Sequence, residues 1–411
     1  MRILFVAIAC SPHTARWIDQ ITGMGWDIHL FHDSQEHPHA ELRDVSIHSL
    51  VLPPAEARGR CRHTGVPWPW MRGSTRLTKL LLRTKHYAPA ERLRRLIAEL
   101  QPDIVHTLEM QRCGYLTAAA RRLFPAGHFP KWIYSCWGND LYLYSQRDGH
   151  LPRIQEVLSG CDYLITDCER DVGPARQMGF DGAVLGVVPV GGGFRLDAVR
   201  AMRQAGPVSL RRTINLKGRH DEQFGGRALV GLEALRKCAG KLAGYEIVVH
   251  FASDNVRREA ALLARETGLS VTVLPSSPHR EMLRLMSRSR IAIGLSISDG
   301  SPNTMLEALI AGAFPIQSDT ISTREWIDGK NGLLVPPEDV AAVAEAITRA
   351  VQDDDLVNRA AELNTEMADR RLERGKIQAK VIEMYQRVMA DSGGRPSCVR
   401  AEVARGRVFG G

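Results

Sequence analysis

Short apolar runs that alternate with amphipathic stretches constrain the fold of this chain most strongly. The runs RILFVAIA (2–9), CDYLITDC (161–168) and YEIVVHFAS (245–253) have the length of buried strands, and helical patterns such as TARWIDQITGMG (14–25) lie between such runs. Parallel strands covered on both faces are continuously apolar, and a helix usually forms the crossover between two of them. The sequence therefore predicts an α/β fold with doubly wound parallel sheets.

The chain divides near a glycine-rich break. At 411 residues it is long enough for two domains. VGGGF (190–194) interrupts the alternation, and a second series of strands and helices follows it. We expect one Rossmann-like domain over 1–195 and another over 206–371, with VGGGF as the hinge. A helix over about 372–391 is expected to pack back on the first domain, and 392–411 to be a disordered tail.

The cysteines and the hydropathy indicate a cytoplasmic protein. The eight cysteines are scattered without any C-x-x-C pair, so they indicate reduced, mostly buried thiols and no zinc site. No apolar run approaches the roughly 18 residues of a membrane span. Asp353–Asp355 formally contains a D-x-D metal motif but lies between predicted helices. We therefore expect no metal site.

The net charge of +8 is concentrated in one segment. Residues 58–95 hold eleven Lys or Arg and one acid, Glu91, with Trp68 and Trp70 inside the run. Two interpretations stay open: a solvated helix face with a loop, or a patch that binds the anionic inner face of the cell membrane. No nucleic-acid-binding motif accompanies the charge, so nucleic acid is not an expected partner.

The stretch SDGSPNTMLEAL (298–309) carries the clearest chemical signal. Ser301 is a good N-cap and Pro302 a favoured first helical residue, so a helix is expected to begin there, directly after the strand IAIGLSIS. A helix start at the carboxyl end of such a strand faces the ligand crevice and suits a diphosphate. The helix-start residues Gly300, Ser301, Pro302, Asn303 and Thr304 are therefore candidate phosphate ligands.

Two carboxylates flank this helix start. Asp299 lies in the loop before it and Glu307 one and a half turns inside it. One acid for a ribose and one for a sugar would suit a nucleotide-sugar. The alternative is a capped core helix with two incidental acids.

The stretch resembles the C-terminal signature of glycosyltransferase family 4, the retaining GT-B enzymes. That signature is an acid, seven residues, a Glu, and then Ala, Gly and Pro leading into a strand; here Asp299, Glu307, Ala308, Gly312 and Pro315 match it. The block at 324–347 is similar to the family's next block. The similarity is strong over roughly 212–350 and weaker over 1–195. Asp299 departs from the usual Glu and reaches one methylene less far.

The resemblance also implies cations on the donor phosphates. Arg219 follows Gly218 as the family's Arg does, whereas Gly225 or Gly226 occupies the position of the family's Lys. We infer that Lys217 or Arg227 supplies the second charge, because guanidinium and ammonium groups both bind phosphate. A solvated charge run is the alternative.

The N-terminal half should bind the acceptor. By resemblance, His13 lies in the acceptor-facing loop, and the strand PDIVHTL ends near His106. CWGND (136–140) corresponds to the family's H-G-x-D stretch, with Trp137 in place of the His, followed by Gly138. Asp140 is a candidate for binding an acceptor or donor-sugar hydroxyl. An isolated loop histidine such as His13 is otherwise simply solvated.

The resemblance implies a GT-B fold with two Rossmann-like domains facing a cleft. It implies a retaining, hexosyltransferase-like enzyme that moves a sugar from a nucleoside-diphosphate-sugar to an acceptor, without a metal or other cofactor. Asp299, Glu307, Arg219 and Asp140 are then the candidate catalytic residues. The basic segment favours a lipid-linked or surface-polysaccharide acceptor and a peripheral membrane location. A sugar-nucleotide epimerase of the same fold and a catalytically degenerate nucleotide-sugar-binding protein remain alternatives.

Overall fold

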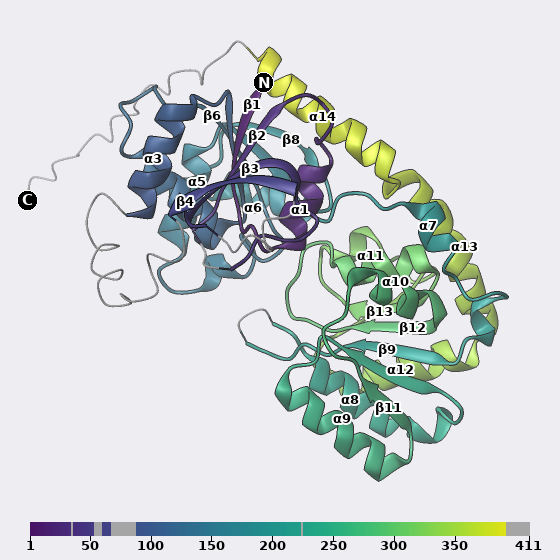
Figure 1. The fold of residues 1–411 in the computed structure, drawn as a ribbon. Helices are drawn as coiled ribbons and strands as arrows, with labels where there is room; N and C mark the ends of the chain where they lie inside the picture. Colours follow the sequence, from purple (N-terminus) through teal and green to yellow (C-terminus); the bar gives the residue numbers. More distant parts are fainter. Residues whose placement is uncertain (34–35, 53–59, 67–87, 223–224, 392–411) are drawn as a thin grey trace, which may run out of the picture.

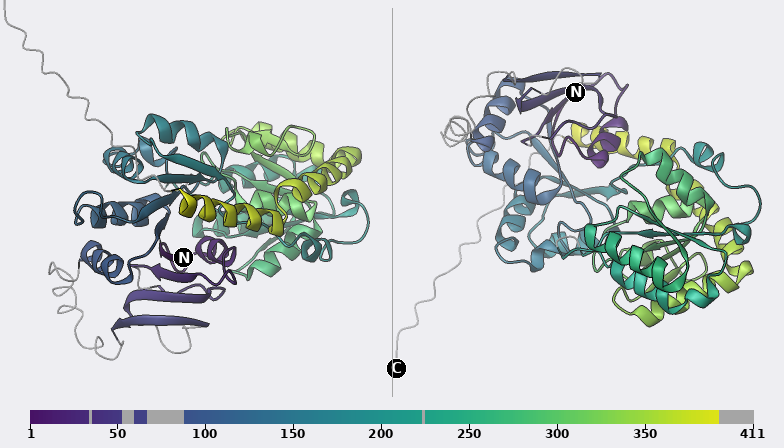
Figure 2. Two further views of the ribbon diagram at one scale, coloured as in Figure 1. Left: turned by 90° about the horizontal axis from the view of Figure 1, so that it is seen from above. Right: turned by 60° about the horizontal axis from the view of Figure 1, so that its bottom comes forward.

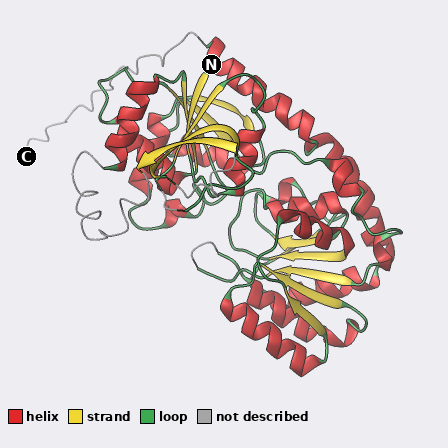
Figure 3. Ribbon diagram, in the orientation of Figure 1, coloured by secondary structure: helices red, strands yellow, loops and turns green. Residues whose placement is uncertain are grey.

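The computed structural model describes residues 1–33, 36–52, 60–66, 88–222 and 225–391, which form two lobes around two parallel sheets (Figures 1 and 3). The sheet of the N-terminal lobe has the strand order β4-β3-β2-β1-β5-β6-β7-β8, and its neighbouring strands pair in parallel. Its strands are β1 (Arg2–Val6), β2 (Asp27–Phe31), β3 (Arg43–Val51), β4 (Arg60–Val66), β5 (Ile104–Leu108), β6 (Lys131–Ser135), β7 (Tyr163–Thr166) and β8 (Ala183–Val187).

Alternate residues of β1 show how this sheet is covered on both faces. Ile3 and Phe5 pack with α1 (Pro12–Asp19) and α14 (Arg374–Ala390). Leu4 and Val6 belong to the core on the opposite face. That core includes residues of α3 (Pro89–Leu100), α4 (Tyr115–Arg121), α5 (Leu151–Gly160) and α6 (Val172–Gln177). Because successive strand side chains point to opposite faces, a wholly apolar strand requires helices on both.

The sheet of the C-terminal lobe has the order β11-β10-β9-β12-β13-β14, also parallel. Its strands are β9 (Thr213–Lys217), β10 (Glu246–His250), β11 (Ser270–Val273), β12 (Ser289–Gly294), β13 (Phe314–Ser318) and β14 (Leu333–Val335). One face packs on α8 (Ala228–Lys237), α9 (Asp254–Thr267) and α12 (Val340–Gln352). The other packs on α7 (Leu196–Arg200), α10 (His279–Arg288), α11 (Asn303–Ala311) and α13 (Asp354–Arg371). The predicted α/β fold with two Rossmann-like doubly wound halves is confirmed.

The chain crosses between the lobes at two adjacent places. The backbone N–H of Phe194 donates to Leu372 O at 2.8 Å, and that of Arg374 donates to Phe194 O at 3.0 Å. A Cβ atom on Gly193 would lie only 2.6 Å from Arg374 Cα, so this crossing requires glycine. The predicted glycine-rich hinge is thus one of two paired crossings. From the other, α14 runs back along the N-terminal lobe (Figures 1 and 2).

Two predictions fall largely on residues outside the described part of the chain. These are the disordered tail at 392–411 and most of the basic segment at 58–95, including Trp68 and Trp70. Within the described part of that segment, Arg94 and Arg95 both pair with Glu91. Among the described helices, none is both long enough and apolar enough to traverse a bilayer.

Candidate functional site

The predicted helix start, with Ser301 as N-cap and Pro302 as first helical residue, is displaced by one residue. Helix α11 begins at Asn303, with Pro302 in the N-cap position and no side-chain capping bond. The Ser301 hydroxyl instead donates to Asp167 O and accepts from Trp326 Nε1, both at 2.9 Å. The predictions of Ser301 as N-cap and Pro302 as first helical residue are therefore wrong, because contacts with Asp167 and Trp326 already occupy the hydroxyl.

Among the described residues, buried polar atoms without partners lie at the start of α11, in the loop of Trp137 and at the carboxyl end of β10. Asn303 Oδ1 and Thr304 Oγ1 are buried, and neither has a hydrogen-bond partner in the described part of the chain. The same holds for Trp137 Nε1 and for both ring nitrogens of His250, which pairs in register with Lys217. Buried polar atoms are nearly always hydrogen-bonded, so such a set suggests a polar ligand. The first N–H groups of the helix add donors without helical acceptors.

Asp299 and Lys217 meet at the carboxyl ends of β12 and β9. Lys217 Nζ lies 3.8 Å from Asp299 Oδ2, and Asp299 Oδ1 accepts from its neighbour Gly300 N at 2.9 Å. Both side chains are about 30 % exposed, at 28 % and 31 %. A ligand can therefore reach a cation and a carboxylate side by side.

The two candidate arginines differ in their surroundings. Arg219 pairs with Asp221 at 2.7 Å and is 45 % exposed. Arg227 is only 10 % exposed; its Nε lies 2.8 Å from Glu338 and its Nη2 3.5 Å from Glu222. Of the two, Arg219 is the more accessible to a ligand, whereas Arg227 is held by acids.

Glu307 is buried among groups that the sequence analysis did not identify. Its Oε1 lies 2.8 Å from His279 Nε2 and 3.9 Å from an Arg16 guanidinium nitrogen, with a side-chain exposure of 7 %. His279 opens α10 after Pro278. Arg16 stands one turn after His13 on α1, and this i, i+3 spacing was the available signal. Glu307 thus joins the two lobes.

On the N-terminal lobe, His13 and Trp137 face the start of α11. Their rings make an edge-on contact with centroids 5.4 Å apart, and His13 Nδ1 lies 3.2 Å from Asn303 Nδ2. Burial, with the charge of Arg16, lowers the pKa of His13 to about 4. The imidazole is therefore neutral at pH 7. Gly138 is so close to the other lobe that a Cβ atom there would lie 2.0 Å from Gly300 N.

Two predicted substrate-binding residues are instead core residues. His106 is 0 % exposed, with ring nitrogens 2.6 Å from Tyr385 OH and 2.8 Å from Ser135 Oγ, and burial lowers its pKa to about 3. Asp140 is 3 % exposed, and one oxygen accepts from Trp137 N and Tyr134 OH, each at 2.8 Å. Neither side chain can contact an acceptor as predicted. Asp140 instead shapes the loop that carries Trp137 and Gly138.

A set of contacts between the lobes was also missed. Asp167, just after β7, accepts from Val190 N and Ser301 N, each at 2.8 Å. Arg170 donates to Asp299 O at 2.6 Å and to Gly138 O at 2.7 Å. The loop before α11 is therefore fastened to the N-terminal lobe through its backbone. Every residue has a backbone carbonyl, so the sequence does not indicate which carbonyl a side chain will contact.

The described residues contain no group of three or more His, Cys, Asp or Glu that could hold a metal ion. In the D-x-D stretch, Asp353 caps α13 by accepting from Leu356 N at 2.8 Å, and Asp354 pairs with Arg290 at 2.7 Å. These two carboxylates therefore make structural contacts in the folded chain.

Two family models match this chain. Residues 2–167 match the model described as "Glycosyl transferase 4-like", and residues 224–353 match "Glycosyl transferases group 1". The two matches fall on the two lobes. They bear out the resemblance found in the sequence.

Solved structures share the fold over nearly the whole chain. Sucrose-phosphate synthase from Thermosynechococcus elongatus is 18% identical with a TM-score of 0.68, covering 95% of this chain and 100% of that one. Anabaena Alr3699/HepE, solved with UDP and glucose, is 15% identical with a TM-score of 0.66, covering 94% and 100%. At these identities the likeness establishes the fold alone.

One curated relative matches a shorter stretch. The exopolysaccharide phosphotransferase SCO2592 of Streptomyces coelicolor is 35% identical over 99 residues, which are 23% of this chain and 10% of that protein. The chain thus spans about a tenth of that relative's length.

Proposed function

Because this chain belongs to the GT-B glycosyltransferases similar to family 4, we propose that it transfers a sugar from a nucleoside-diphosphate-sugar to a glycan or lipid-linked acceptor, with retention. One observation carries the proposal. Asn303 Oδ1 and Thr304 Oγ1, which have no partner in the described part of the chain, lie at the start of the helix that carries Glu307, and Lys217 at the end of β9 pairs with Asp299 in the loop before that helix. The donor would bind in the lobe of residues 206–371 and the acceptor in that of 1–195.

The donor diphosphate would bind at the start of α11. Backbone N–H groups and the positive end of the helix dipole favour an anion there. Lys217 and Arg219 would add charge, and Glu307 would accept from ribose hydroxyls. Asp299 would contact the transferred sugar. The Anabaena protein is described in complexes with UDP and UDP-glucose, which supports UDP-glucose as the first donor to test.

Catalysis would depend on stabilising the leaving diphosphate. Negative charge grows on the diphosphate as the bond to the sugar breaks, and groups already aimed at it act without reorganisation. Lys217, Arg219 and the helix start would provide this stabilisation without a metal or other cofactor. The imidazole of His13 is neutral and its Nδ1 accepts from Asn303 Nδ2, so its Nε2–H would donate a hydrogen bond to a sugar hydroxyl.

The acceptor would enter a cavity of the N-terminal lobe. This cavity of about 410 Å³ lies at the carboxyl ends of β1 and β2, where His32, Asp33, Arg112 and Arg153 line it. His32 is 4 % exposed, and within the described residues neither of its ring nitrogens has a partner. Such groups suit sugar hydroxyls. The basic segment 58–95 would place this lobe on an anionic membrane, on the cytoplasmic side.

Product analysis tests the proposal. The full-length protein is incubated with UDP-, GDP-, ADP- and CMP-sugars, with and without an extracted lipid fraction, and released nucleotide and glycan products are measured. We expect acceptor-dependent release of a nucleoside diphosphate, product anomers that match the donor, and loss of release in Lys217→Met. The matched control is Arg257→Gln, an exposed cation on α9.

The alternatives predict other outcomes. Interconversion of donor sugars without glycan product would identify an epimerase, and tight donor binding without turnover a binding protein. Either result would overturn the proposed transfer.

A further inference from the structure

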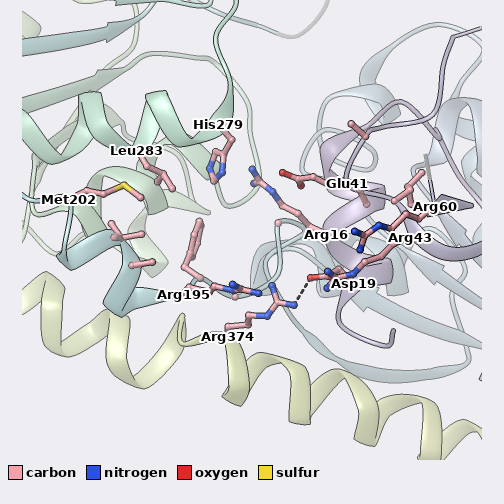
Figure 4. A pocket seen from close by; sticks show the side chains of 18 residues that line it. Arg16, Asp19, Glu41, Arg43, Arg60, Arg195, Met202, His279, Leu283 and Arg374 are labelled. Atoms are coloured by element: carbon pink, nitrogen blue, oxygen red, sulfur yellow. Dashed lines mark hydrogen bonds and ion pairs between the residues drawn. The ribbon is translucent and has the colours of Figure 1, made fainter. Parts of the chain in front are cut away.

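A cavity of about 540 Å³ lies between the lobes beside the proposed donor site (Figure 4). The N-terminal lobe contributes residues of α1 and of 40–43, and the crossing contributes residues of 191–195. The C-terminal lobe contributes residues of α7 and α10. A ligand in this cavity would contact both lobes and the crossing that joins them.

The cavity has an excess of positive charge. Five arginines and two carboxylates line it: Arg16, Arg43, Arg60, Arg195, Arg374, Asp19 and Glu41. This leaves three positive charges in excess. Asp19 is already shared by Arg43 and Arg374. In the described ranges, Arg60 and Arg195 make no ion pair, so these two arginines are available to an anion.

The charged and apolar walls face each other. Figure 4 shows Met202 and Leu283 of the C-terminal lobe on one side, with Arg43 and Arg60 across the cavity. Phe194 adds apolar surface between them. An occupant would therefore have an anionic end and a body with less polar faces.

We propose that this cavity binds a phosphate monoester of a sugar-sized molecule, with the phosphate against the arginines and the body against the apolar wall. Guanidinium groups match phosphate oxygens in a fork. A phosphate monoester carries about −1.5 to −2 charge at pH 7. This charge balances the excess positive charge of the cavity better than the single negative charge of a carboxylate would. The volume exceeds what one phosphate needs and suits a small organic ligand.

Two wall residues connect this cavity to the proposed donor site. Arg16 and His279 line the cavity, and both also contact Glu307, at 3.9 Å and 2.8 Å. A bound phosphate would attract Arg16 and so change the surroundings of Glu307. The phosphate ester could be an effector, or an acceptor that binds here instead of in the cavity at the ends of β1 and β2, because both would present the same chemistry. The binding site itself does not depend on the proposed transfer, since its test measures binding.

Calorimetry on the full-length protein at low salt tests the site, with glucose 6-phosphate and inorganic phosphate as probes and glucose as the uncharged control. We expect saturable binding of the phosphates, no comparable binding of glucose, and at least a tenfold weaker glucose 6-phosphate affinity in Arg43→Gln/Arg195→Gln. Arg257→Gln should bind like the wild type. If the double variant unfolds at a lower temperature, the single Arg60→Gln variant replaces it, with the same weakening expected.

Adding a nucleotide-sugar then distinguishes a phosphate ester that acts as an acceptor from one that acts as an effector. Consumption of glucose 6-phosphate would identify an acceptor, and an unchanged phosphate that shifts UDP affinity would identify an effector. The site is refuted if neither phosphate binds saturably, or if the arginine variants bind them as the wild type does. UDP binding is measured separately. If UDP still binds, the proposed donor site stands even where the phosphate site is refuted.

Discussion

Glu307 shows how one residue can combine several interactions. Its carboxylate lies at 7 % exposure between His279 and Arg16, on a helix whose start is proposed to bind phosphate. Burial of an isolated carboxylate is costly, so the Arg16 guanidinium and the hydrogen bond with His279 explain why it is tolerated. A ribose hydroxyl would add a charged hydrogen bond to this set.

Glu307→Gln should weaken UDP binding without unfolding the protein. A lost hydrogen bond to a charged group costs about 1.5–3 kcal/mol, or roughly 10- to 150-fold in affinity. Calorimetry with UDP measures the affinity, and thermal unfolding monitors the fold. Glu345→Gln, on the exposed side of α12, is the control. Equal UDP affinity in wild type and Glu307→Gln would remove Glu307 from the donor site.

Sequence reasoning placed some residues correctly and others not. Asp299 and Lys217, each a candidate for the donor site, lie close together because the carboxyl ends of parallel strands share one edge of the sheet. His106 was misplaced because its ring bonds to Tyr385, 279 residues further along the chain. A local pattern predicts the strand but not which later element covers it.

At the scale of elements, α14 completes the core of the N-terminal lobe. Ile377, Val381 and Tyr385 pack with β1 and α1 in one buried cluster. The Tyr385 hydroxyl accepts from Trp17 Nε1 at 3.0 Å and lies 2.6 Å from His106 Nδ1. One hydroxyl therefore satisfies two buried rings.

Tyr385→Phe should lower the free energy of unfolding by about 1–3 kcal/mol, because it leaves at least one buried ring nitrogen without a partner. Denaturant unfolding followed by fluorescence measures the change. Tyr142→Phe is the control, since Tyr142 is 38% exposed and its ring contact with Arg170 survives the substitution. A loss no larger than in the control would show that the hydroxyl contributes little to docking α14.

The sequence analysis missed β3 and β4, and for β4 the physical cause is its place at the edge of the sheet. β3 and β4 lie at one side of the sheet, with β4 at its edge, and β4 reads RCRHTGV. An edge strand has one neighbour and less apolar cover, so polar residues are accepted there. The central strands were predicted because they are buried on both faces, as the continuously buried β5 shows.

For the whole molecule, Asp167 links the arrangement of the lobes to pH. Burial raises the pKa of this carboxyl from 3.8 to about 7, although two backbone N–H groups favour its charged form. The folded state therefore takes up a proton that the unfolded state lacks between about pH 4 and pH 7. This contribution to the free energy of unfolding falls as pH rises through that window and is constant above it.

The difference in the free energy of unfolding between wild type and Asp167→Asn should consequently change by up to about 1.4 kcal/mol per pH unit between pH 5 and 7. The wild type loses stability relative to the variant as pH rises. Denaturant unfolding at several pH values measures this, since other titrating groups cancel in the difference. Parallel pH profiles would show that Asp167 titrates outside this range.

The close approach of Gly138 and Gly300 gives the last prediction. A Cβ atom on Gly138 would lie 2.0 Å from Gly300 N and 2.5 Å from Gly300 Cα. Backbone atoms on both sides cannot yield as a flexible side chain would, so Gly138→Ala should force the lobes apart. Each lobe keeps its own core, and thermal unfolding should change little. Small-angle X-ray scattering should show a larger radius of gyration than for the wild type.

Turnover of Gly138→Ala should fall on the order of 10²-fold, because displacing reacting groups by about 1 Å can cost that much. Gly240→Ala is the matched control, since a Cβ atom there meets nothing within 4 Å. UDP affinity should be nearly unchanged, because the proposed donor ligands lie on the C-terminal lobe. A wild-type scattering profile with wild-type turnover would mean that the loops shift locally instead. Reduced turnover with an unchanged radius would confine the effect to the loop carrying Trp137.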